Sequence, residues 1–140
     1  MPTVFTGNPS GFGIMRFLSG GDTDTFGTKG GVITAFPGMS IGGTATVALQ
    51  TNGDIVAAGN AGLAPSNQSQ FTSSFALARY LSGGQLDTTF GNGGRISTSF
   101  ASASVAFIAA MAIQNDGKIV VAGETGSVAG NIAVARYLAQ

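Results

Sequence analysis

The chain of 140 residues contains no cysteine, no histidine and no tryptophan. Without cysteine it can form neither a disulfide nor a thiolate metal site. Without histidine it lacks the side chain most often used for acid–base catalysis near neutral pH, which is also the commonest metal ligand. We therefore expect no catalytic residue, no metal site and no cofactor.

Charge is also scarce. Charged residues make up 9% of the chain, against about 25% in average soluble domains, and six basic residues balance six acidic ones. No basic run exists to bind nucleic acid or an anionic membrane surface. The longest apolar run, from Val105 to Ile113, has nine residues, whereas a spanning helix needs about 20. We expect neither nucleic-acid binding nor membrane insertion.

What the chain does contain is glycine, 23 residues of it, and 44% apolar residues, which is enough to form a core. It also contains a repeated unit. The stretch from Ala48 to Gly59 returns 64 residues later as Ala112-Ile-Gln-Asn-Asp-Gly-Lys-Ile-Val-Val-Ala-Gly123. Each copy is typical of strand, tight turn and strand. Asn52-Gly53 predicts a two-residue hairpin turn with a positive φ at both positions.

Further strands repeat around this hairpin with a period of about 57 to 64 residues. A strand ending in Arg-aromatic-Leu occurs three times and is followed twice by a strand that ends in Phe. The predicted strands cover residues 3–7, 12–18, 31–36, 44–50, 55–59, 75–81, 94–100, 107–114, 118–123 and 132–138. Four strands in each long repeat, with almost no helical periodicity, predict an all-β fold built from β-propeller blades of four antiparallel strands.

The sequence also resembles the delta-60 repeat family, bacterial β-propeller repeats of unassigned function. The resemblance rests on Ile113–Gly123 and on Phe75–Phe100, which contains Ala-Arg-Tyr-Leu and Leu-Asp-Thr-Thr-Phe-Gly. The first copy departs from the pattern, with Met15-Arg-Phe-Leu18 and a loop one residue short. The resemblance implies the propeller fold and no catalytic residues.

We expect one propeller-like domain over residues 1–140, with about two and a half repeats. It comprises a partial blade over 3–36, a full blade over 44–100 and a partial blade over 107–138. Closed propellers have about 4–8 blades, so one chain cannot close. We therefore expect homo-oligomerisation through incomplete blades and exposed strand edges. A closed ring, an open filament and a fragment of a longer propeller remain alternatives.

The candidate ligand-binding residues lie in the longest expected loop, from Asn60 to Ser74, which is the part least like its repeat. They are Asn67, Gln68, Gln70 and Phe71. Amide groups beside an aromatic ring suit a sugar, which needs hydrogen bonds to its hydroxyls and a flat apolar surface. The alternative is a solvated loop with no ligand.

Three other motifs have structural interpretations. Gly38-Met-Ser-Ile-Gly42 matches a nucleophile elbow, but no histidine is present to act as a base. Asp22 and Asp24 partly resemble a calcium loop that lacks its closing Glu, and an Asx-type turn is favoured. The arginine of the repeated strand (Arg16, Arg79, Arg136) is expected to pair with an acid such as Asp87.

The function expected from the sequence is therefore that of a non-catalytic, homo-oligomeric scaffold. The alternative is a multivalent module that binds carbohydrate or protein through its loops. An extracellular or cell-surface location is expected from the composition and the family resemblance, although the chain shows no signal peptide.

Overall fold

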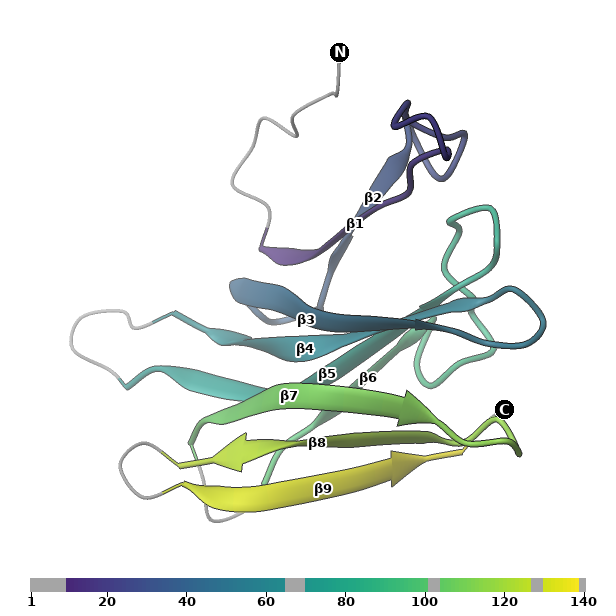
Figure 1. The fold of residues 1–140 in the computed structure, drawn as a ribbon. Coiled ribbons are helices and arrows are strands. Elements are labelled where there is room, and N and C mark those ends of the chain that lie inside the picture. The colour runs from purple at the N-terminus through teal and green to yellow at the C-terminus, as the bar shows by residue number, and fades with distance from the viewer. Residues whose placement is uncertain (1–9, 65–69, 101–103, 127–129, 139–140) are drawn as a thin grey trace.

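The computed structural model describes residues 10–64, 70–100, 104–126 and 130–138. Three antiparallel sheets stack face to face (Figure 1). The first sheet contains β1 (Gly11–Met15) and β2 (Gly31–Ala35). The middle sheet contains β3 (Ile41–Leu49), β4 (Ile55–Leu63), β5 (Thr72–Tyr80) and β6 (Arg95–Thr98). The last sheet contains β7 (Ala106–Ile113), β8 (Ile119–Thr125) and β9 (Asn131–Tyr137).

Each strand within a sheet pairs with the one before it in sequence, so the sheets are simple meanders. The expected all-β class with antiparallel strands is confirmed. The predicted strand over residues 3–7 lies outside the described residues. Among those that are described, no helix is long and apolar enough to cross a membrane.

The hairpin turn differs from the prediction. At Asn52-Gly53 only the glycine has a positive φ, of 88°. The amide of Gly53 donates to the carbonyl of Gln50 at 3.0 Å, and the amide of Gln50 donates to the carbonyl of Asp54 at 2.8 Å. The loop is therefore a three-residue type in which a turn is followed by a left-handed glycine. Gly117, with a φ of 81°, repeats this geometry in the last sheet.

The prediction of a long loop from Asn60 to Ser74 is wrong at both ends. β4 continues to Leu63 and β5 begins at Thr72. Asn60 pairs with Gly43 on one side and with Phe75 on the other. Neighbouring strands on both sides supply hydrogen-bond partners, and this pairing overrides the loop-like composition of the segment.

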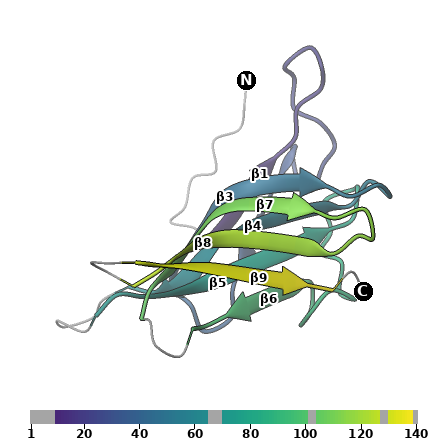
Figure 2. The same cartoon turned by 60° about the horizontal axis from the view of Figure 1, so that its bottom comes forward.

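The inner strands of the middle and last sheets come close together, because their side chains are small. β3 and β7 lie side by side (Figure 2). Each contains a bulge at the same point of the repeat, at Ala45 and at Ala109. Opposite each bulge is a glycine: a Cβ on Gly123 would lie 1.9 Å from the carbonyl oxygen of Phe107, which no L side chain can accommodate.

Two apolar cores hold the stack together, one on each side of the middle sheet. In β4 and β5 alternate residues point to opposite faces. Tyr80 and Ala78 pack against Phe12 of the first sheet. Leu77 and Phe75 pack against Ile119 of the last sheet. Because both faces of the middle sheet are covered, its central strands are apolar on both sides.

A tyrosine–threonine hydrogen bond joins each pair of adjacent sheets. The hydroxyl of Tyr80 donates to Oγ1 of Thr34 at 2.7 Å. At the equivalent place in the next junction, the hydroxyls of Tyr137 and Thr98 are 2.8 Å apart. The first sheet has Phe17 at the tyrosine position, so it cannot form this bond with a preceding sheet.

We predict that Tyr80→Phe lowers the free energy of unfolding by about 1 kcal/mol, because it removes this buried hydrogen bond and leaves the Thr34 hydroxyl without its donor. Urea unfolding followed by circular dichroism measures the loss. Tyr137→Phe serves as the matched variant at the second junction, and equal stability of wild type and both variants would contradict the prediction.

Candidate binding site

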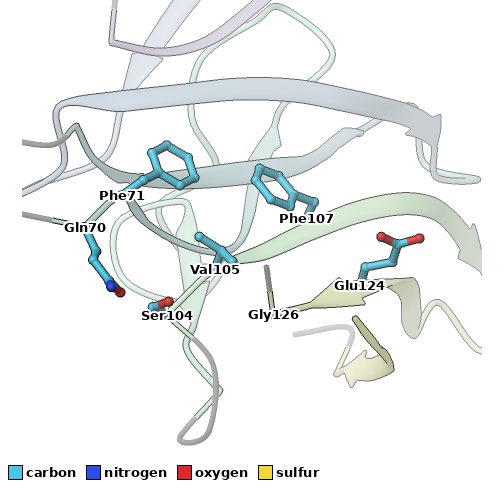
Figure 3. Close-up of a pocket in the computed structure, with 7 residues that line it drawn as sticks. All are labelled: Gln70, Phe71, Ser104, Val105, Phe107, Glu124 and Gly126. Atoms are coloured by element: carbon cyan, nitrogen blue, oxygen red, sulfur yellow. The ribbon is translucent and has the colours of Figure 1, made fainter. Parts of the chain in front are cut away.

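A pocket with a volume of about 580 Å³ lies where the middle and last sheets meet (Figure 3). It is lined by residues from the segment before β5, the segment before β7, the start of β7 and the end of β8 with the residue after it. They are Gln70, Phe71, Ser104, Val105, Phe107, Glu124 and Gly126. Its volume is in the range of small-molecule sites, about 300–1,000 Å³.

Two phenylalanine rings form the apolar part of the pocket. The centroids of Phe71 and Phe107 are 6.0 Å apart and the ring planes differ by 12°. Parallel rings need about 7 Å between them to admit another group, twice a carbon–carbon contact of about 3.5 Å. The pair therefore offers one aromatic surface and no slot between the rings.

The polar part of the pocket includes a carboxylate placed by strand register. Phe107 on β7 lies directly opposite Glu124 on β8. Directly opposed residues of an antiparallel pair point to the same side of a sheet. Both side chains are exposed. In the view of Figure 3, Phe107 lies between Phe71 and Glu124.

Two of the four candidate residues from the sequence line this pocket, namely Gln70 and Phe71. Asn67 and Gln68 lie outside the described residues. Sequence reasoning missed Phe107 and Glu124, which are distant from the loop in sequence and approach it only through the stacking of the sheets. A comparison of the two repeats could have found them, because the equivalent residues of the middle sheet are Gly43 and Asn60, which differ in size and charge from Phe107 and Glu124.

The repeated arginine forms an internal ion pair in the first two of its three copies, and among the described residues no ion pair includes Arg136. Arg79 pairs with Asp87 at 2.7 Å, with the two side chains only 6% and 10% exposed, and its guanidinium lies 4.7 Å from the Phe90 ring centroid. Arg16 repeats this with Asp24 at 2.5 Å, although its side chain is 39% exposed. The first copy therefore keeps the pair although its loop is one residue short. Both arginines hold their own loops in place.

Asp87 is held in its charged form. Its Oδ1 accepts hydrogen bonds from the hydroxyl of Thr89 at 2.6 Å and from the amide of Thr89 at 3.0 Å, which is an Asx-type turn. The hydrogen bond from the Thr89 hydroxyl, together with the Thr89 amide and the paired Arg79, lowers the pKa of Asp87 below its ordinary value of 3.8, against the opposing effect of burial.

The remaining motifs also have structural contacts. Oγ of Ser40, the central residue of the elbow-like sequence, accepts a hydrogen bond from the amide of Ala64 at 2.9 Å. Asp24, half of the calcium-like pair, is bonded to Arg16 and to the amide of Thr25. Among the described residues, no group of three or more acidic side chains is placed to hold a metal ion.

Comparison with known families supports the fold. Two segments, residues 50–90 and 114–140, match the family model described as "Domain of unknown function (DUF5122) beta-propeller". The chain resembles a β-propeller repeat. Its three sheets are accordingly termed blades, numbered from the first. No curated protein and no solved structure matches the chain.

Proposed function

We propose that this chain is a non-catalytic assembly module, a homo-oligomeric β-propeller scaffold in which copies pack blade against blade. The observation that carries this proposal is the different fate of equivalent residues in the second and third blades. Phe75 and Leu77 in β5 are 0% exposed, whereas their counterparts in β9, Ile132 and Val134, are 85% and 62% exposed. The repeat places apolar side chains on a face that nothing in the described structure covers.

The opposite end of the stack is similar. Tyr80, in the second blade, is buried against the first blade. Its counterpart Phe17 is half exposed. Each end of the stack therefore exposes apolar side chains whose equivalents are buried where two blades meet.

The gain from covering these faces is of the same order as the cost of association. Burying a Val, Leu or Ile side chain contributes about 1.5–3 kcal/mol. Ile132 and Val134 on the last blade are both more than half exposed, and their counterparts are buried. With the partner face included, the total is comparable to the cost of association, about 4–15 kcal/mol.

The proposed occupant of the last blade's open face is the first blade of a second copy. Two copies contributing about three blades each would make a six-bladed ring, while contacts that fail to close would make a filament. We also propose that the repeats are delta-60 repeats and that the protein acts outside the cytoplasm. These two points rest on the quoted motifs and on the low charge.

Solution mass tests the proposal. We predict that light scattering after size exclusion gives a discrete multimer for the wild type and a monomer for Val134→Lys, because a charge at the centre of the covered face cannot be desolvated. Leu63→Lys is the matched control, since Leu63 is similarly exposed but lies on the second blade. It should leave the mass unchanged.

Other outcomes have definite meanings. A broad, concentration-dependent mass that Val134→Lys reduces to that of a monomer would indicate the filament. A wild-type chain that stays monomeric, alone and at high concentration, would contradict the assembly proposal and indicate that further blades come from a longer chain.

A second candidate function, multivalent ligand binding, is favoured by one observation: Gln70 and Phe71, chosen from the sequence, line a pocket of ligand size with Phe107 and Glu124. An oligomer would present several such pockets on one particle, so weak sites would gain avidity.

A further inference from the structure

The pocket lined by Phe71, Phe107 and Glu124 lies where the sequence departs from its own repeat. In the second blade the opposed pair on the inner two strands is Gly43 and Asn60. In the third blade the same pair is Phe107 and Glu124. Since the second blade forms the same hairpin with glycine and asparagine, the fold does not require this phenylalanine or this glutamate.

The phenylalanine is also placed where folding gains little from it. Phe107 is 42% exposed, so much of its ring remains in contact with water. It contacts Phe71, which lies just before β5. Together the rings form a surface that offers a ligand apolar contact. The partial negative charge on the ring faces also attracts a cation.

The glutamate supplies the charge that the rings favour in a ligand. Glu124 is the only glutamate in the chain. The ion pairs among the described residues are Arg16–Asp24, Arg79–Asp87 and Lys118–Asp116, and none of them includes Glu124. No lysine or arginine is among the residues lining the pocket. The pocket thus joins one carboxylate to two aromatic rings.

We propose that this pocket binds a methylated organic cation, such as a trimethylammonium group. The methyl groups would lie against Phe71 and Phe107, where cation–π attraction adds to apolar contact, and the cation would face Glu124. The side-chain amide of Gln70 would hydrogen-bond to a polar substituent of the ligand, as donor or as acceptor. The inference deepens the ligand-binding candidate above and does not require copies to assemble.

The charge separates this ligand class from the neutral sugar suggested by the loop sequence. A sugar would use the rings and the amide, but it has no charge to match Glu124. A trimethylammonium group would interact both with the Phe107 ring and with the Glu124 carboxylate, the two groups by which the third blade differs from the second. Free choline and a choline headgroup on a lipid share this chemistry.

The test is a titration of the full-length protein followed by amide chemical shifts, with choline and with its neutral isostere 3,3-dimethylbutan-1-ol. Choline should bind about tenfold more tightly than the isostere. In Glu124→Gln, which keeps the side-chain shape, that preference should fall but not vanish, because the two rings still attract the cation. Phe107→Gly, the residue that the second blade uses, should weaken choline binding about tenfold while the rest of the spectrum is unchanged.

Several outcomes would overturn the inference. Equal binding of choline and the isostere to the wild type would show an apolar pocket without cation selectivity. Binding of methyl glucoside but not choline would reject the cation and keep the ligand-binding function, and binding of neither would reject both. Repeating the titration on Val134→Lys separates ligand binding from assembly. Phosphatidylcholine vesicles in place of choline show whether the source is a lipid headgroup.

Discussion

Asp87→Asn is expected to lower the free energy of unfolding by about 3 kcal/mol, because it removes the carboxylate that pairs with the buried guanidinium of Arg79. Both hydrogen bonds from Thr89 go to Oδ1 and can be kept by asparagine, but the asparagine Nδ2 would then face the Arg79 guanidinium in place of Oδ2. Urea unfolding of the two proteins at one concentration measures the difference. A loss below about 0.5 kcal/mol would show that the pair is dispensable.

Asp24→Asn is the matched control, because it breaks the equivalent pair in a more exposed setting. Its loss of unfolding free energy should be clearly smaller than that of Asp87→Asn.

The pH dependence of stability follows from the lowered pKa of Asp87. The folded state binds this proton less readily than the unfolded state, so the stabilisation is complete well above pH 3.8 and is lost as the pH falls through the folded-state pKa. In Asp87→Asn this part of the acid sensitivity should be absent.

Leu77→Ala is expected to cost about 2–5 kcal/mol, because Leu77 is fully buried between the second and third blades and its truncation leaves a cavity. Val134→Ala, at the equivalent position of the third blade, should change monomer stability by less than about 0.5 kcal/mol. Thermal and urea unfolding at a concentration low enough to keep the chain monomeric would measure both.

The difference in stability loss between Leu77→Ala and Val134→Ala tests whether the outer face of the third blade is uncovered. Similar large losses would mean that Val134 is already covered, either by another copy or by a different arrangement of the blades. Similar small losses would mean that the second and third blades pack loosely.

The sequence predicted the strands well, because each hairpin repeats its own turn glycine and its own apolar pattern. Gly53 and Gly117 follow Asn and Asp residues in two copies of one unit, so each copy supports the other. The extension of β4 to Leu63 could not be predicted in this way. Asn60 and Gly62 do not favour a strand, and they join one because β3 and β5 offer partners on both sides.

The candidate site could be predicted only in part, for a similar reason. Gln70 and Phe71 belong to one loop and were found from its composition. Phe107 and Glu124 belong to different strands, and only the β7–β8 register places them opposite each other. A residue-by-residue comparison of the repeats would have indicated them, because Gly43 and Asn60 show what the fold itself needs at those positions.

The tyrosine–threonine bonds between blades give the stack a polarity. Tyr80 and Tyr137 project from one face of their blades, and Thr34 and Thr98 project from the opposite face of the blades before them. The two ends of a chain are therefore different surfaces, like the plus and minus ends of a cytoskeletal polymer. If copies assemble as proposed, a copy blocked at one end would terminate growth there and leave the other end free to elongate.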